Sequence, residues 1–189
     1  MMPIPQGLLP VTATFVVTLL LTPVVRAAAR HYGMVSRPRE DRWSKLPTAL
    51  LGGIAIFLAV FLCSLLLLPS IPKLGVVLAA STLPFLVGLA DDIFDLKPYQ
   101  KLIGQILAAI VILQGDLLLP WTGSTVLNMG ITLFWLIGIT NAVNLLDNMD
   151  GLAAGVSSIA AGFLSWSLWI HGQEAEAILV ACFAASLLG

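Results

Sequence analysis

The sequence predicts an all-α, polytopic transmembrane helical bundle of about six helices plus a truncated seventh, with the N-terminus outside. Mean hydropathy is +1.00 and only 10% of the residues are charged, whereas about 25% are charged in soluble domains. The apolar residues form long runs, most of which approach the roughly 20 residues that a helix needs to cross a bilayer. Basic residues lie mainly in every second connection between these runs, as the positive-inside rule expects of a multi-pass membrane protein. We therefore expect residues 1–189 to form a single membrane domain.

Seven apolar runs define the expected helices. The first run precedes Arg26, the first basic residue, which is the reverse of a secretory signal and indicates a retained helix. The fifth run is short, so a tilted, re-entrant or interfacial segment is an alternative to a full crossing. The last 13 residues would span only about 20 Å as a helix, so we expect an N-terminal portion of a larger fold. The runs are 7–25, 47–68, 74–90, 102–119, 126–140, 152–170 and 177–189.

The basic residues orient the chain. Six of the nine follow the first run, Lys97 and Lys101 follow the third, and only Lys73 lies in a connection on the opposite side. The positive-inside rule then places the ends of the first, third and fifth runs in the cytoplasm. A net charge of −1 without a further basic run argues against a nucleic-acid partner. Cys63 and Cys182 lie inside apolar runs and are interpreted as buried, inert thiols.

An acidic cluster formed by Asp91, Asp92 and Asp95 ends the third run. A carboxylate at the centre of a bilayer costs roughly 2.5–3.5 kcal/mol, so its position at the edge is significant. If the helix continues by one turn, Asp91 and Asp95 share a face. Close carboxylates favour Mg²⁺, which binds through carboxylates and substrate phosphates, and Lys97 and Lys101 suit phosphate oxygens. The alternative is a solvated acidic loop balanced by these lysines.

A second polar cluster follows the fifth run at a spacing of three residues. On a regular helix such residues drift by about 60° per step, so they converge on one pocket only where a helix end runs into a loop. Their amides and carboxylates could bind a nucleobase edge and ribose hydroxyls. Helix capping and turn formation are the alternative. By the predicted orientation, both clusters face the cytoplasm. The members are Asn141, Asn144, Asp147 and Asp150.

Three motifs together resemble those of the polyprenyl-phosphate N-acetylhexosamine-1-phosphate transferases, glycosyltransferase family 4. They are Pro47–Gly53 (PTALLGG), Asp91–Asp95 (DDIFD) and Asn141–Leu152 (NAVNLLDNMDGL). Asp95, in place of a lysine, makes the second motif more similar to the GlcNAc-1-phosphate branch than to the muramoyl-pentapeptide branch.

The resemblance implies an enzyme that transfers a sugar-1-phosphate, GlcNAc-1-phosphate by the second motif, from a UDP-sugar to undecaprenyl or another polyprenyl phosphate. UMP is released, and Mg²⁺ or Mn²⁺ is the cofactor. The resemblance further implies a multi-pass protein of the bacterial inner membrane with a cytoplasmic active site, acting in cell-wall and other envelope polysaccharide synthesis. It is also compatible with a homodimer.

The resemblance also assigns roles to individual residues. Asp91 and Asp92 would be catalytic, through positioning and electrostatics, and together with Asp95 they would be the metal ligands. The implied substrate-binding residues are Asn141, Asn144, Asp147, Asp150, Lys45 and Thr48.

Departures from the family pattern leave alternatives open. Ser36, Ser44 and Asn148 replace a commoner Asp, His and Gly, respectively. A further metal-binding Asp and a His-rich loop of the family would lie after Gly189, so we expect this chain alone to be inactive unless a second polypeptide completes it. One alternative is a non-catalytic membrane relative, or a carrier whose carboxylates bind ions. Another is an intramembrane Mg²⁺-dependent prenyltransferase, although Asn141–Leu152 does not fit its Asp-rich motifs.

Overall fold

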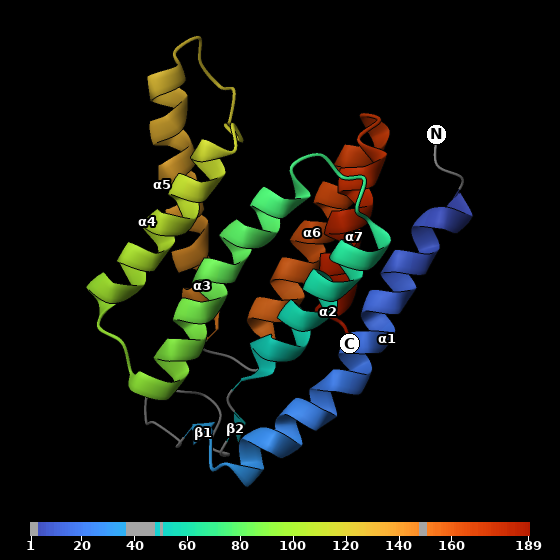
Figure 1. The fold of residues 1–189 in the computed structure, drawn as a ribbon, viewed down its shortest axis with the longest axis vertical. Helices are drawn as coiled ribbons and strands as arrows, with labels where there is room; N and C mark the ends of the chain where they lie inside the picture. The colour runs from blue at the N-terminus through green and yellow to red at the C-terminus, as the bar shows by residue number, and fades with distance from the viewer. Residues whose placement is uncertain (1–3, 37–47, 50, 148–150) are drawn as a thin grey trace. The chain divides into compact units, whose positions relative to one another are not determined.

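The computed structural model describes residues 4–36, 48–49, 51–147 and 151–189. These residues form seven α-helices and one two-stranded ladder, which confirms the predicted all-α bundle (Figure 1). Four of the helices are long and apolar enough to cross a membrane. The chain divides into two compact units, Met1–Pro72 with Leu146–Gly189, and Lys73–Leu145. Each unit is described by itself below.

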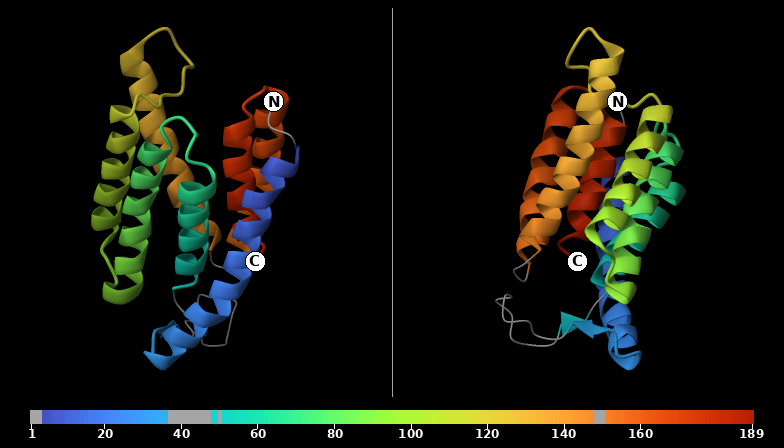
Figure 2. Two further views of the ribbon diagram at one scale, coloured as in Figure 1. Left: turned by 45° about the vertical axis from the view of Figure 1, so that its right-hand side comes forward. Right: turned by 90° about the vertical axis from the view of Figure 1, so that its left-hand side faces the viewer.

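The first unit packs helices through small side chains. It contains α1 (Ile4–His31), α2 (Gly52–Leu67), α6 (Leu152–Ile170) and α7 (Glu174–Ser186). Helix α1 packs against α2 and α7, and α6 packs against α7 (Figure 2). Small residues at helix contacts let backbones approach closely, which is how helices associate where lipid removes the hydrophobic driving force. The buried residues of α2 and α7 are Ala55, Ala59, Cys63, Ser64, Ala177, Ile178, Cys182 and Ser186.

Helix α1 is continuous through Pro10 and Pro23 and extends beyond the predicted end at residue 25. The hydroxyls of Thr14, Thr18 and Thr22 each donate to the carbonyl four residues earlier, at 2.8 to 2.9 Å. Polar groups inside a membrane must find partners within the protein, and these threonines find them within their own helix. Thr14 and Thr18 can therefore be fully buried.

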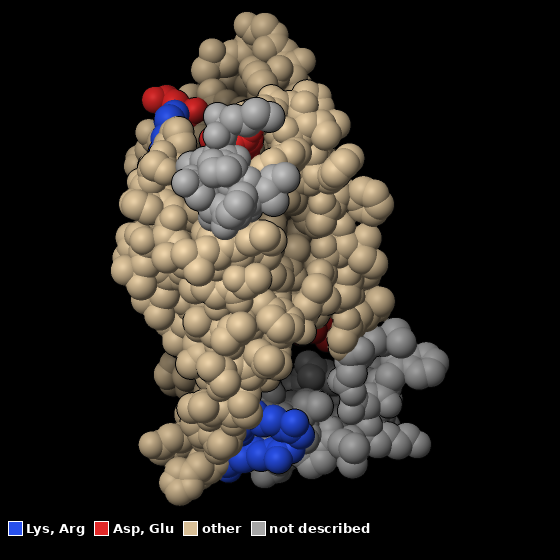
Figure 3. Space-filling model, turned by 90° about the vertical axis from the view of Figure 1, so that its right-hand side faces the viewer, with Lys and Arg blue, Asp and Glu red and all other residues tan. Residues whose placement is uncertain are grey.

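A short antiparallel ladder follows α1. Strand β1 (Val35–Ser36) pairs with β2 (Thr48–Ala49), so that Ser36 lies opposite Thr48. Basic side chains gather at the end of α1 that leads into this ladder. Figure 3 shows a face on which charged side chains lie toward the ends and leave a broad uncharged surface between them.

The second unit is built on a close helical hairpin. Helix α3 (Leu74–Phe94) runs antiparallel to α4 (Pro98–Gln114). Gly104 and Gly115 lie where the two backbones approach, because a Cβ on either residue would overlap the side chains of Val87 and Val76, respectively. The hairpin therefore requires glycine at two positions on the α4 side.

Charged residues of the hairpin are confined to its two ends. At one end the Lys73 Nζ donates to the backbone carbonyl of Asp116, at 3.1 Å. The opposite end holds Asp91 and Lys101, and residues 74–90 and 102–115 carry no charge. At 1.5 Å per residue, the 21 residues of α3 span about 31 Å, close to the roughly 30 Å of a hydrocarbon core.

Helix α5 (Thr125–Leu146) completes the unit and has 22 residues, so the fifth run forms a helix long enough for a full crossing. The connection before it is fixed by the buried residues Asn128 and Thr132. The Asn128 Oδ1 accepts from the backbone N–H and the hydroxyl of Thr122, both at 2.9 Å, and its Nδ2 donates to the Thr122 carbonyl at 3.0 Å. The Thr132 hydroxyl accepts from the Leu119 N–H at 3.0 Å.

Candidate active site

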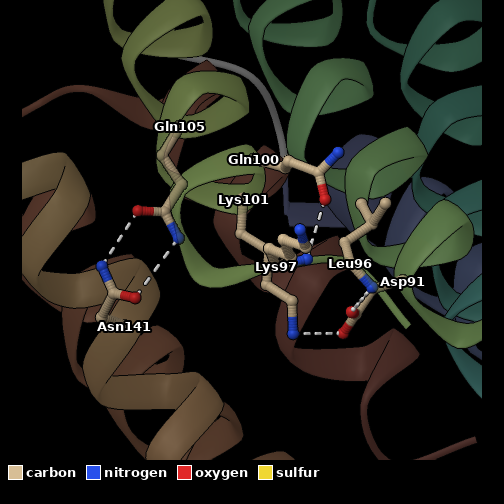
Figure 4. Close-up of polar contacts among 7 residues, drawn as sticks. All are labelled: Asp91, Leu96, Lys97, Gln100, Lys101, Gln105 and Asn141. Carbon is tan, nitrogen blue, oxygen red and sulfur yellow. Dashed lines mark hydrogen bonds and ion pairs between the residues drawn. The ribbon is translucent and has the colours of Figure 1, made fainter. Parts of the chain in front are cut away.

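The acidic cluster lies at the end of α3, which continues one turn past the predicted apolar run. Asp91 is half-buried and Asp92 is exposed, both in the last turn. The Asp91 Oδ1 accepts from the Leu96 N–H at 3.0 Å, and its Oδ2 lies 2.6 Å from the Lys101 Nζ (Figure 4). One carboxylate thus closes the chain reversal after α3 and joins it to α4.

Asp95 terminates α3 instead of extending it. Its φ of 52° and ψ of 67° are left-handed, and its N–H donates to the Asp91 carbonyl at 2.9 Å. Asp and Asn tolerate this conformation better than most residues. The helical register that would place Asp91 and Asp95 on one face therefore ends at Phe94.

The geometry bears on the predicted metal ligands. Among the residues that the structure describes, no three His, Cys, Asp or Glu side chains are grouped so that they could hold a metal ion. Asp91 and Asp92 remain suitable as a pair, because Mg²⁺ is commonly bound by one or two carboxylates plus substrate phosphates. The donor set therefore fits a metal that the substrate helps to hold, and the third ligand, Asp95, stays a prediction.

The start of α4 positions Lys101. Lys97 precedes the helix in an extended conformation, and Pro98 occupies the first helical position, where its missing N–H costs nothing. The Gln100 side chain accepts from the Lys97 N–H at 2.8 Å. This cap fixes where α4 begins and so which residue of its first turn reaches Asp91.

The second cluster is helical at its first two positions. Asn141 and Asn144 lie in the last two turns of α5 and are exposed, and the exposed Asp147 follows in a turn. Asp150 and Lys45 lie outside the described residues. Thr48 lies in β2, where its backbone pairs with Ser36. Their predicted roles in substrate binding stay predictions.

Asn141 is joined to α4 by a residue that the sequence analysis missed. Asn141 Nδ2 donates to Gln105 Oε1 at 2.9 Å and to the Ile137 carbonyl at 2.9 Å (Figure 4). Gln105 Nε2 donates in return to Asn141 Oδ1 at 3.4 Å. Gln105 is the first polar residue of the apolar run 102–119 and follows Lys101 by four residues. This is a usable signal, because polar residues in membrane helices are rare.

Helix α4 therefore connects the two predicted clusters. Residues four apart lie on one helical face, and on this face Lys101 contacts Asp91 of α3 while Gln105 contacts Asn141 of α5. Beside Gln105 lies a cavity of about 230 Å³ between α3, α4 and α5, lined mainly by apolar side chains. Lys101, which is predicted to contact phosphate, and Gln105, whose amide contacts Asn141, thus lie on neighbouring turns of α4.

Sequence comparisons show the family of the chain. A sequence model of glycosyl transferase family 4 matches residues 74–189, which is more than half of the chain. The chain belongs to glycosyltransferase family 4. The matched region of this family 4 chain contains both polar clusters and all of α3, α4 and α5.

Several curated proteins are similar to this family 4 chain. A phospho-N-acetylmuramoyl-pentapeptide-transferase of Lactobacillus gasseri is 32% identical, over 97% of this chain and 65% of the relative. A decaprenyl-phosphate N-acetylglucosaminephosphotransferase of Mycobacterium tuberculosis is 33% identical, over 77% and 41%. A probable undecaprenyl-phosphate N-acetylglucosaminyl 1-phosphate transferase of Bacillus subtilis is 27% identical, over 97% and 55%.

The family 4 chain therefore spans between about two fifths and two thirds of the length of these relatives. Their names describe polyprenyl-phosphate and phospho-sugar transferases, which confirms the family that the three motifs predict. Identity does not separate the two sugar classes, since muramoyl and GlcNAc relatives match at 32% and 33%.

Proposed function

We propose that the protein containing this chain transfers GlcNAc-1-phosphate from a UDP-sugar to a polyprenyl phosphate, such as undecaprenyl phosphate, and releases UMP. The observation that carries the proposal is the face of α4, which holds Lys101 against Asp91 and Gln105 against Asn141. The names of the relatives support the reaction class.

The proposed step is a displacement at phosphorus. An oxygen of the polyprenyl phosphate attacks the sugar-bearing phosphorus of the UDP-sugar, and the bond from that phosphorus to the bridging oxygen breaks as UMP leaves. A phosphate monoester has its second pKa near 6 and is largely ionised at neutral pH, so it needs no base. Catalysis then consists mainly of positioning and electrostatic stabilisation. Asp91 and Asp92 would position the reacting phosphates, and Lys97 and Lys101 would balance their charge.

The proposal includes Mg²⁺ or Mn²⁺, held by Asp91 and Asp92 with Asp95 as the predicted third ligand. When bound, the ion would neutralise the phosphates that carboxylates alone would repel. The family resemblance would assign nucleotide binding to Asn141, Asn144, Asp147, Asp150, Lys45 and Thr48.

The sugar and the location are parts of the same proposal. Asp95 favours GlcNAc-1-phosphate over the muramoyl-pentapeptide substrate. The distribution of basic residues favours a cytoplasmic site. A bacterial inner membrane is what the family resemblance implies. A role in envelope polysaccharide synthesis and a homodimer stay predictions. The family assignment gives no support to the prenyltransferase alternative.

The test is UMP release by the full-length protein in liposomes containing undecaprenyl phosphate, with UDP-GlcNAc and Mg²⁺. We expect release that requires the lipid phosphate and stops when the divalent ion is chelated. UDP-MurNAc-pentapeptide, tested in parallel, should give less UMP. If a folded protein releases no more UMP than the lipid-free control with either donor, the non-catalytic alternative is correct.

A further inference from the structure

We propose that Gln105 is a positioning residue that fixes the Asn141 amide so that Asn141 offers the nucleotide a hydrogen-bond acceptor. This inference rests on the proposed function and adds to it a residue that none of the three motifs contains. The ligand group that binds Asn141 is then a hydrogen-bond donor, such as a ribose hydroxyl or the imide N–H of a uracil ring.

The first observation is that the Asn141 amide nitrogen is fully used. A side-chain amide has two N–H donors and one oxygen that accepts through two lone pairs. Both donors of Asn141 are engaged at 2.9 Å, one by Gln105 Oε1 on α4 and the other by the Ile137 carbonyl on its own helix. What Asn141 has left to offer a ligand is therefore acceptor capacity at Oδ1.

The second observation is that Oδ1 is only partly used. Gln105 Nε2 reaches it at 3.4 Å, which is long for a hydrogen bond. Within the described part of the chain, Gln105 Nε2 is the one donor that reaches Oδ1, which leaves its second lone pair for a ligand. Asn141 is also exposed. A ligand with an O–H or N–H group can therefore bind Oδ1 without breaking the pair.

The third observation is that Gln105 is itself held in place. It is half-buried on α4, beside the cavity between α3, α4 and α5. One turn earlier, Lys101 contacts Asp91 and fixes the register of α4 against α3. Without Gln105, the Ile137 carbonyl still holds one N–H of Asn141, but the other N–H loses its acceptor and is left to face the ligand. An O–H or N–H donor of the ligand would then face the Asn141 N–H, and a hydrogen bond lost in this way costs binding free energy.

The experiment compares variants of the full-length protein. Gln105→Leu removes both hydrogen bonds, whereas Gln105→Glu keeps an acceptor for Asn141 Nδ2. Gln114→Leu changes an exposed glutamine at the other end of α4 and is the matched control. We expect Gln105→Leu to raise the KM for the UDP-sugar about tenfold, the equivalent of one good hydrogen bond, and to leave the KM for the polyprenyl phosphate unchanged. Gln105→Glu should stay within about twofold of the wild type.

A double-mutant cycle with Asn141→Ala tests whether Gln105 acts through Asn141. If it does, adding Gln105→Leu to Asn141→Ala changes the KM for the UDP-sugar no further. The inference is overturned if the two effects multiply, if Gln105→Leu behaves like Gln114→Leu, or if the KM values of both substrates rise together. Should Gln105→Leu fail to fold, Gln105→Lys offers Asn141 only donors and must weaken nucleotide binding in the same way.

Nucleotide binding separates this inference from the proposed function. UDP affinity of the solubilised full-length protein, measured by calorimetry, tests the Gln105–Asn141 pair whether or not turnover is found. A wild type that binds UDP but releases no UMP contradicts the proposed function alone. A Gln105→Leu variant that binds UDP as tightly as wild type contradicts this inference alone.

Discussion

Lys101 Nζ lies 2.6 Å from Asp91 Oδ2, so one ion pair joins the first turn of α4 to the last turn of α3. About a third of each side chain is exposed, at 33% and 28%. An exposed pair contributes about 0–1 kcal/mol to stability. Its main consequence is to orient α4, since the ion pair determines which face of this helix lies against the acidic cluster.

Lys101→Met should therefore separate activity from stability. We expect the free energy of unfolding to fall by no more than about 1 kcal/mol, because the pair is solvent-screened. The kcat/KM for UMP release should fall at least about tenfold, since charge-assisted contacts to phosphate are lost. Lys73→Met, at the opposite end of the hairpin, should leave kcat/KM unchanged. Equal kinetic effects of the two variants would contradict a local role of Lys101.

Asp91→Asn and Asp92→Asn should each lower kcat by about 100-fold or more, as expected when an electrostatic contact to a reacting phosphate is removed. UMP release by the full-length protein is the measurement. Asp116→Asn is the control, because Asp116 lies at the opposite end of the hairpin and its backbone carbonyl accepts from Lys73 Nζ whatever its side chain. An Asp91→Asn and an Asp92→Asn variant with full activity would remove both residues from the site.

Gly104→Ala should destabilise the protein by about 1–3 kcal/mol, because the added Cβ overlaps Val87 in a packed interface. The midpoint of thermal unfolding in detergent measures the effect. Gly130→Ala, where a Cβ meets open space on α5, should be neutral or slightly stabilising. Val87→Ala combined with Gly104→Ala should restore part of the loss, and an absence of any rescue would show that the two helices do not approach there.

Asn128→Leu tests the opposite end of α5 from Asn141. Three hydrogen bonds join the Asn128 side chain to Thr122. Their loss should lower the unfolding midpoint, at a cost of about 1–3 kcal/mol, because three hydrogen bonds that hold the connection against the buried Asn128 are removed. KM for both substrates should be unchanged. Asn141→Ala should show the reverse pattern, with a raised KM for the UDP-sugar and little change in the midpoint.

Membrane orientation can be tested with two single cysteines. Gly123→Cys lies in the exposed connection before α5, and Tyr99→Cys lies at the exposed start of α4. An impermeant thiol reagent added to intact cells should label Gly123→Cys and should label Tyr99→Cys only after lysis. The native Cys63 and Cys182 are buried and give little background. The opposite labelling would place the acidic cluster outside.

For the residues that the structure describes, the sequence was sufficient to predict the number and class of the helices. Hydrophobic runs end where apolar residues end, whereas helices end where backbone hydrogen bonding stops. For this reason α3 continues through Asp91 and Asp92, and α5 continues past Thr140 to Leu146.

The contacts within the site could not be read from spacing alone. The partner of Asn141 lies 36 residues earlier, on another helix, so only the hydrogen bonds between α4 and α5 reveal Gln105. Similarly, the left-handed conformation of Asp95 follows from a tertiary chain reversal, whereas sequence spacing suggested a continuing helix.

The placement of charge at the two ends of the α3–α4 hairpin has a consequence for how a lipid substrate arrives. Residues 74–90 of α3 are uncharged and span about 26 Å at 1.5 Å per residue. The Lys73 contact and the Asp91–Lys101 pair can therefore each lie near the headgroup level of one leaflet. A phosphate on a polyprenyl chain is held at that same depth by its own tail. Under the proposed function, such a substrate would meet Asp91 and Lys101 by lateral diffusion within its leaflet, and its tail would never have to leave the hydrocarbon. The acceptor would then search in two dimensions only, while the soluble UDP-sugar would come from the adjacent water.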